Sequence, residues 1–264
     1  MSPLDDASVN ELAARLTTER PQRGQLELPS TSYPDMTLED AYRIQRVAAH
    51  RRELEGVVLL GWKIGLVDPV AQAAVGVSEP IAGRLFDAGL IPDGGHVDEL
   101  VGGGGRVECE FGFLLADDLV GPGVTGAHVL QATAGIMPAF EIIEDRLPSS
   151  ATVADMIADN CSGAGFAVGA VLISPSTFDL VTTGVILEID SRIVATGASG
   201  AVMGNPAHAV AWLANRLASV GETLHTGQVI LTGAAIPPVP VEAGHQLVAT
   251  FGGGLGSIRV VGLG

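Results

Sequence analysis

The chain has 264 residues, of which 47% are hydrophobic and 17% charged, and its formal net charge is −16. This length and apolar fraction allow a large buried core and exclude a disordered protein. The acidic balance argues against nucleic acids and anionic membranes as partners, because both bind basic surfaces. No apolar run has the length of a membrane helix, and no basic segment followed by an apolar one marks a signal peptide. Cys109 and Cys161 lack metal-binding spacing and fit free thiols in a reducing cytoplasm.

The N-terminal part of the chain has the pattern of helices. Ser8 and Glu11 form a capping-box pattern ahead of an apolar stripe. A second helix is predicted over Leu38–Leu54, starting after Thr37. Residues 21–34 between the two helices contain Pro and Ser and are predicted to be a connector.

The rest of the chain consists mainly of short strand-like segments rich in Val and Ile and bounded by Gly or Pro. These segments are VVLLGWKIGL, RVECEFGFLL, FEIIED, FAVGAVLI, GVILEID, QVILTG, HQLVATF and SIRVVGLG. A helix is predicted to begin near Asn205 and Pro206, and a shorter one over residues 129–135. We therefore expect an α+β fold, with a helical N-terminal region over residues 1–56 and a β-rich core over 57–264.

Two glutamates, Glu108 and Glu110, share one face of the predicted strand RVECEFGFLL, because side chains two residues apart point the same way. Like charges placed side by side repel each other. A third acid, Glu141, lies in another strand-like run. Three carboxylates converging on one point require a cation, and all-oxygen ligands suit Mg²⁺ or Mn²⁺ better than zinc. The alternative is a solvated edge strand whose glutamates point outward.

Lys63 lies inside the apolar segment GWKIGL. Its side chain either reaches the surface or neutralises an acidic site, where it could act in acid–base chemistry. The loop ADNCSGAGFAVG places Asn160 and Ser162 before Gly-rich turns, which is a typical location for residues that bind substrate. No nucleophile elbow surrounds Ser162, and the six histidines lack zinc-site spacing.

Several segments, in this order, resemble the 2-keto-4-pentenoate hydratase and 4-oxalocrotonate decarboxylase family of the fumarylacetoacetate hydrolase-like superfamily. They are GWKIGL, GVSEPIAGRLF, RVECEFGFLLADDL, PAFEIIEDRL, DNCSGAGFAVG, GNPAHAVAWLANRL, GQVILTG and GLGSIRV, all within residues 35–264. The resemblance implies a β-rich core of mixed sheets or a β-roll, with a smaller N-terminal helical region. It also implies Mg²⁺ or Mn²⁺ bound by Glu108, Glu110 and Glu141, an active-site lysine at Lys63 and a substrate contact at Ser162.

The resemblance implies a lyase that hydrates a 2-hydroxy-2,4-dienoate to a 4-hydroxy-2-keto acid in meta-cleavage degradation of aromatic compounds. Decarboxylation of 4-oxalocrotonate (2-oxo-3-hexenedioate) is the alternative reaction. Hydrolysis of an acylpyruvate ranks behind both, because it normally uses a water-activating base, often His, which no motif here supplies. A further alternative is a non-catalytic partner subunit that keeps the fold. The presence of all three acids and Lys63 argues against it, because such a subunit would not need them.

The resemblance also bears on assembly and specificity. Family members are typically homo-oligomers, and the low charge fraction of this hydrophobic chain favours covered surfaces as well. The resemblance further implies that the chain can associate with a hydratase, decarboxylase or aldolase of the same pathway. Ile81 and Ala82 stand where many members have an acidic and an aromatic residue. We expect Ile81 and Ala82 to lie near the end of the substrate where hydration and decarboxylation differ.

Overall fold

The computed structural model describes residues 4–18, 25–97 and 104–262. The helices of this part are α1 (Asp6–Thr18), α2 (Pro29–Ser32), α3 (Leu38–Leu54), α4 (Pro69–Ala74), α6 (Gly126–Ala132), α7 (Val153–Ala158) and α8 (Pro206–Ala218). Its strands are β1 (Leu59–Gly65), β2 (Ile81–Phe86), β3 (Leu90–Ile91), β4 (Gly105–Leu115), β5 (Thr133–Glu144), β6 (Gly163–Val168), β7 (Gly184–Ile189), β8 (Arg192–Ala198), β9 (Val229–Ala234), β10 (Val239–Val241), β11 (Gln246–Phe251) and β12 (Gly256–Val261). None of these helices has the length and apolar character needed to cross a membrane.

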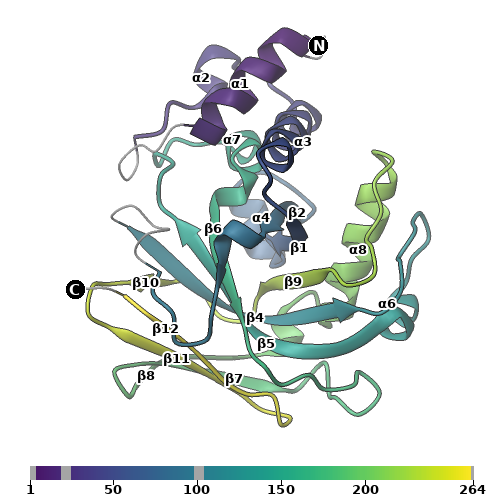
Figure 1. Cartoon of the computed structure of the whole chain (residues 1–264), viewed down its shortest axis with the longest axis vertical. Coiled ribbons are helices and arrows are strands. Elements are labelled where there is room, and N and C mark those ends of the chain that lie inside the picture. Colours follow the sequence, from purple (N-terminus) through teal and green to yellow (C-terminus); the bar gives the residue numbers. More distant parts are fainter. Residues whose placement is uncertain (1–3, 19–24, 98–103, 263–264) are drawn as a thin grey trace.

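Two sheets form the body of the molecule (Figure 1). The larger sheet has the order β2-β1-β9-β4-β5-β6-β3, with β10 also paired to β4, and the smaller has the order β12-β11-β7-β8. Strand β2, at one edge of the larger sheet, also contacts β6. The larger sheet therefore curls until strands from its two ends meet, and side chains from distant strands face each other inside the curl.

The space between the two sheets is filled by aromatic and aliphatic side chains. The Phe111 ring on β4 meets the Phe251 ring on β11 edge-on, with ring centroids 5.2 Å apart. Cys109 is buried in the same core. Because side chains alternate along a strand, the apolar face of β4 leaves its even-numbered residues on the other face, inside the curl.

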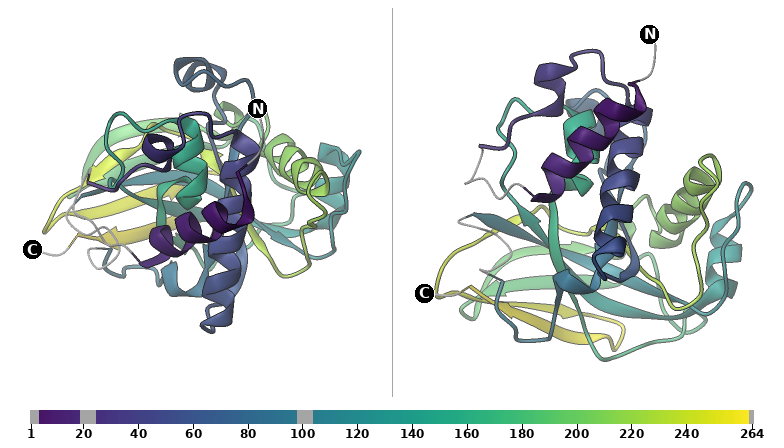
Figure 2. Two further views of the ribbon diagram at one scale, coloured as in Figure 1. Left: turned by 90° about the horizontal axis from the view of Figure 1, so that it is seen from above. Right: turned by 45° about the horizontal axis from the view of Figure 1, so that its top comes forward.

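The helices α1, α2, α3 and α7 cover one end of the larger sheet (Figure 2). The apolar faces of α1, α3 and α7 form one buried cluster that also contains Ile81 of β2 and Cys161, which follows α7. These helices therefore support the loop after α7 directly. The division of the chain at residue 56 remains our proposal.

The predicted α+β fold with a β-rich core is confirmed, and α3 has the predicted bounds. Thr37 caps it, and the Asp40 carboxylate completes the capping box. Four predicted segments differ in detail. Helix α1 begins at Asp6, and Ser8 N donates to the Asp5 carboxylate, so Ser8 lies inside the helix and does not cap it. The connector over 21–34 contains α2 in its described part, α6 lies over Gly126–Ala132 rather than 129–135, and FAVGAVLI is a strand only as far as Val168. Helix α6 ends early because Thr133 pairs with β4, and β6 ends where Gly169 N turns to donate to Pro138 O.

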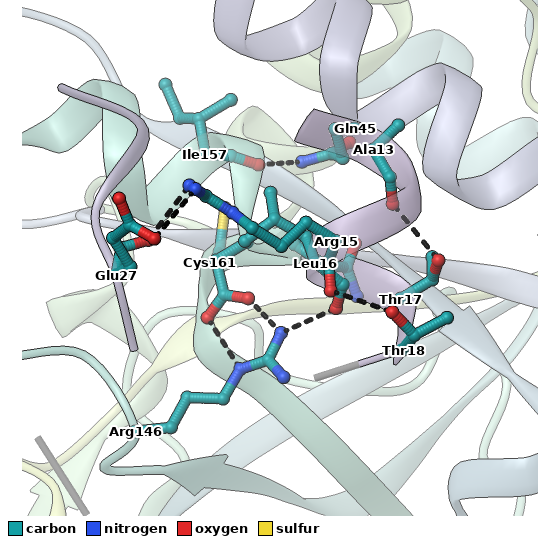
Figure 3. A network of polar contacts seen from close by, with 12 residues as sticks. Ala13, Arg15, Leu16, Thr17, Thr18, Glu27, Gln45, Arg146, Ile157 and Cys161 are labelled. Atoms are coloured by element: carbon teal, nitrogen blue, oxygen red, sulfur yellow. Dashed lines mark hydrogen bonds and ion pairs between the residues drawn. The ribbon is translucent and has the colours of Figure 1, made fainter. Parts of the chain in front are cut away.

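An ion pair buried beneath the helices joins the α7 segment to α1. Arg146 Nε donates to Asp159 Oδ2 over 3.0 Å, and Arg146 Nη2 contacts the other carboxylate oxygen. Arg146 Nη2 also donates to Leu16 O of α1 over 3.3 Å (Figure 3). The Asp159 side chain is fully buried, so removing it would take away the carboxylate that the Arg146 guanidinium contacts through two nitrogens.

Asp159→Ala is therefore expected to lower the free energy of unfolding by about 3–5 kcal/mol, the usual effect of breaking a buried ion pair from one side. Urea unfolding followed by circular dichroism measures this change. Glu11→Ala, on the exposed face of α1, is the control and should change stability by less than about 0.5 kcal/mol. A loss of less than about 1 kcal/mol for Asp159→Ala would show that Arg146 finds other compensation.

Candidate active site

Three glutamates gather on the inner face of the curled sheet. One carboxylate oxygen from each of Glu108, Glu110 and Glu141 lies within 4.8 Å of the others. Strand β4 places Glu108 and Glu110 on one face, and its antiparallel register with β5 sets Glu108 directly opposite Glu141. Strand β4 lies inside the sheet between β9 and β5, and Glu110 and Glu141 are 0% and 2% exposed. The alternative of a solvated edge strand is therefore wrong.

Lys63 projects from β1 to the same group and is 3% exposed. Its Nζ donates to Glu141 Oε1 and, over 2.7 Å, to the backbone oxygen of Cys161. Strands β9 and β4 separate β1 from β5 in the sheet, so this contact depends on the curl. Lys63 is the only lysine among the 14 basic residues of the chain. Its side chain neutralises an acidic site and does not reach the surface.

The charges of this group are strongly coupled. Burial, reinforced by the charges of Glu141 and Glu108, raises the pKa of Glu110 well above its usual range. Burial, followed by the charge of Glu141, raises the pKa of Glu108 to about 8, although this side chain is only partly buried. For Lys63, burial disfavours the charged form, but Glu141, Cys161 and Glu108 together outweigh burial and raise the pKa of the ammonium. One ammonium therefore faces three carboxylates, two of which resist ionisation without a further positive charge.

The bonding of Glu110 tests whether a metal ion fits here. Gly233 N donates to Glu110 Oε2 over 2.6 Å, whereas the buried Glu110 Oε1 has no hydrogen-bond partner within the described part of the chain. A buried carboxylate oxygen without a partner is unfavourable by several kcal/mol in apolar surroundings. A hard divalent cation supplies that partner and offsets the excess negative charge, and three carboxylates are the ligands that Mg²⁺ and Mn²⁺ prefer.

The loop that holds Lys63 has a strained backbone. Asn160, Cys161 and Ser162 have φ angles of 52°, 53° and 57°, a left-handed conformation that is unfavourable for residues with a Cβ and that often occurs at functional sites. The strain turns the Cys161 carbonyl towards Lys63 Nζ.

The predicted substrate-binding residues lie in this loop. Asn160 Oδ1 accepts a hydrogen bond from Arg84 N over 2.7 Å, and Asn160 Nδ2 donates to Arg84 O over 2.9 Å. Both polar groups of the Asn160 side chain therefore bind the backbone of β2. Ser162 is buried next to the Cys161 carbonyl. Substrate contacts by Asn160 and Ser162 remain predictions, and the observed bonds of Asn160 support a structural role.

An apolar wall adjoins the acids on the inner face of the sheet. Leu231 is the register partner of Lys63, and Ala139 is the register partner of Glu110. Leu231 and Ala139 form a buried cluster with side chains from β2 and β6. The site therefore combines a charged region with a water-excluding surface, which strengthens electrostatic interactions.

Sequence reasoning missed several residues of this site. Gly233, whose amide binds Glu110, lies in the segment GQVILTG, but a backbone donor leaves no side-chain signal. Gly83 and Gly163 contact the Lys63 side chain closely. The departure at Ile81 and Ala82 falls in β2, where Ile81 packs against the helices instead of the acids. The glycines stand in segments already noted for their resemblance, and their spacing to Lys63 appears only in three dimensions.

The chain is similar to several known proteins. Residues 90–261 match the family described as Fumarylacetoacetate (FAA) hydrolase C-terminal. The 4-oxalocrotonate decarboxylase of Pseudomonas sp. (strain CF600) is 37% identical over 225 residues, covering 85% of each chain. The 2-oxo-hept-4-ene-1,7-dioate hydratase of Escherichia coli is 36% identical over 256 residues, covering 94% of this chain and 95% of the relative. The structure of 4-oxalocrotonate decarboxylase from Pseudomonas putida G7, complexed with magnesium and adipate, superposes with a TM-score of 0.93 at 32% identity, and each chain is covered completely.

Proposed function

Because the chain belongs to the 2-keto-4-pentenoate hydratase and 4-oxalocrotonate decarboxylase family, within the fumarylacetoacetate hydrolase superfamily, we propose that it is a lyase that hydrates a 2-hydroxy-2,4-dienoate. The product is a 4-hydroxy-2-keto acid, formed in meta-cleavage degradation of aromatic compounds. The observation that carries this proposal is the group of three carboxylates with one ammonium on the inner face of the sheet. In this proposal Glu108, Glu110 and Glu141 hold Mg²⁺ or Mn²⁺.

Lys63 is the acid–base residue of the proposal. An ammonium has three N–H donors, and two of them are used by Glu141 and Cys161. The third has no acceptor in the part of the chain that the structure describes, so it is available to a bound substrate. Glu141, Cys161 and Glu108 together outweigh burial and raise the pKa of Lys63, so Nζ keeps its proton until the substrate takes it.

The dienol must isomerise to its keto form before water adds. Proton gain at C5 of the dienol and loss of its hydroxyl proton give the conjugated 2-keto acid. Water then adds across C3 and C4, with oxygen on C4 and hydrogen on C3. A divalent cation bound by the three glutamates supplies Lewis-acid stabilisation of the negative charge on the C2 oxygen. Lys63 Nζ delivers and receives the protons, and the apolar wall beside Leu231 limits access of bulk water.

Decarboxylation of 4-oxalocrotonate is the second candidate. It is favoured by the match, over the full length of both chains, to a 4-oxalocrotonate decarboxylase. The same negative charge develops on the C2 oxygen, but carbon dioxide leaves from the far carboxylate in place of water addition. Hydrolysis of an acylpyruvate has less support, because five of the six histidines are exposed and the sixth, His245, is a half-buried neighbour of Asp190.

The oligomeric state, location and partners of the enzyme can also be proposed. We propose a homo-oligomer in the cytoplasm that associates with a hydratase, decarboxylase or aldolase of the same pathway. The support is the acidic, weakly charged composition of the chain and the resemblance of its motifs. In this proposal Ser162 and Asn160 lie beside the bound substrate.

Metal removal tests the proposed function. Protein treated with EDTA should be inactive, and added Mg²⁺ or Mn²⁺ should restore activity. The assay follows the fall in dienol absorbance as 2-hydroxypenta-2,4-dienoate is consumed. A parallel incubation with 2-oxo-3-hexenedioate, assayed for released carbon dioxide, separates the two lyase reactions. Full activity after EDTA treatment would contradict the metal-dependent mechanism, and release of carbon dioxide without dienol hydration would select the decarboxylase.

A further inference from the structure

The side chain of Lys63 runs between two glycines where the two ends of the curled sheet meet. Gly83 on β2 is the register partner of Lys63, and a Cβ at Gly83 would lie 2.8 Å from Lys63 Cε. Gly163 is the first residue of β6, and a Cβ there would lie 2.7 Å from Lys63 Cε and 3.1 Å from Nζ. These separations are shorter than normal carbon–carbon contacts of about 3.5–4.0 Å. A side chain at either position would occupy the space of the Lys63 stem.

The backbone of Gly163 does not itself require glycine. Its φ of −70° and ψ of 120° are extended values, which every residue with a Cβ can adopt. The other close neighbour of its missing Cβ is Asn160 O at 3.3 Å, a contact that a small shift relieves. The space taken by Lys63 is therefore the physical reason for a glycine at this position.

The rest of the Lys63 environment is equally fixed. The Cys161 carbonyl, held in the left-handed turn, accepts from Nζ at 2.7 Å. The Asn160 side chain ties the turn to both backbone groups of Arg84, the residue after Gly83. Strands β2 and β6 are thereby joined around the lysine stem, and the ammonium lies against Glu141.

We propose that Gly163 and Gly83 are positioning residues, which hold the Lys63 ammonium in its reactive place by leaving room for its stem, with Asn160 fixing the turn that binds it. The catalytic consequence rests on the proposed function. The placement of Lys63 itself does not. Gly163 is the better site for a test, because its two nearest neighbours belong to a flexible side-chain end, whereas Gly83 also meets Asn160 O at 2.9 Å.

Gly163→Ala is expected to lower kcat by about 100-fold, the effect of a displacement of about 1 Å at a reacting group. Mg²⁺ affinity, measured by calorimetric titration, should stay within about threefold of wild type, because the three carboxylates keep their places. Since Lys63 is the only lysine, protein made with isotope-labelled lysine gives a single Cε signal in NMR. That signal should move in Gly163→Ala and stay unchanged in Gly65→Ala. Gly65 lies on the same strand, and its Cβ would meet only Ile81 at 3.4 Å and beyond.

A double-mutant cycle separates positioning from a role in folding. If the added Cβ conflicts with Lys63, Gly163→Ala lowers the melting temperature in the wild-type background and leaves it unchanged in a Lys63→Ala background. Wild-type kcat together with an unmoved lysine signal in Gly163→Ala would overturn the proposal. An equal loss of melting temperature in both backgrounds would also overturn it, because the glycine would then serve the fold. If the wild-type protein lacks lyase activity, the proposed function fails, while the NMR signal and the cycle still decide the placement of Lys63.

Discussion

Glu141→Gln protein should bind Mg²⁺ at least about 100-fold more weakly and lose metal-dependent turnover, while its fold remains. Glu141 supplies one of the three carboxylates and is also the ion-pair partner of Lys63. Groups that merely support metal ligands already change affinity by about 10–100-fold when they are replaced, so a proposed ligand should matter at least as much. Glutamine has the same shape and no charge, which keeps the packing beside β4 intact. Calorimetric titration and circular dichroism measure the two outcomes.

Glu188→Gln is the matched control for this experiment. Glu188 lies on β7 in the smaller sheet, so the same chemical change far from the inner face should leave Mg²⁺ affinity and turnover unaltered. Wild-type Mg²⁺ affinity in Glu141→Gln would remove this residue from the metal site. A collapsed circular dichroism spectrum would instead make its role structural.

Lys63→Met should produce the opposite pattern of binding and catalysis. We expect kcat to fall by about 10²- to 10⁴-fold, the usual contribution of a general acid or base. Mg²⁺ affinity should not fall, because the substitution removes a positive charge that contacts Glu141 and would repel a neighbouring cation. Steady-state kinetics at saturating Mg²⁺, together with a Mg²⁺ titration, test both parts.

The control for the lysine is Arg192→Met, at the exposed start of the edge strand β8. Loss of an exposed cation there should leave both quantities unchanged. If Lys63→Met keeps wild-type kcat, the acid–base role is wrong. If it binds Mg²⁺ much more weakly, the lysine organises the carboxylates instead of moving protons.

Much of the site could be predicted from local patterns. The period of two along β4 predicts that Glu108 and Glu110 lie on one side. For Lys63, the residues alone leave both a surface position and an acidic site open, and only the resemblance to the family predicts the active site. The predicted family is confirmed, and the predicted α+β fold is confirmed as well. These features follow from short-range rules that a strand obeys wherever it lies in a sheet.

What the sequence did not reveal depends on contacts between distant strands. Glu141 reaches Lys63 only because the sheet curls, and no pattern within β1 or β5 encodes that curl. The contact of Asn160 with substrate stays a prediction, and the bonds of its side chain to the backbone of Arg84 join residues far apart in the sequence. Gly163 has no side chain to recognise. A glycine is needed there because a Cβ would collide with Lys63 Cε, and Lys63 lies a hundred residues away in the chain.

The most direct test of the proposed metal site is an anomalous difference map from crystals of the protein soaked in Mn²⁺. We predict one strong peak per chain among the carboxylates of Glu108, Glu110 and Glu141, within about 2.0–2.6 Å of their oxygens. A map without a peak at this position, or with Mn²⁺ bound only elsewhere, would contradict the assignment of these three glutamates as the metal site.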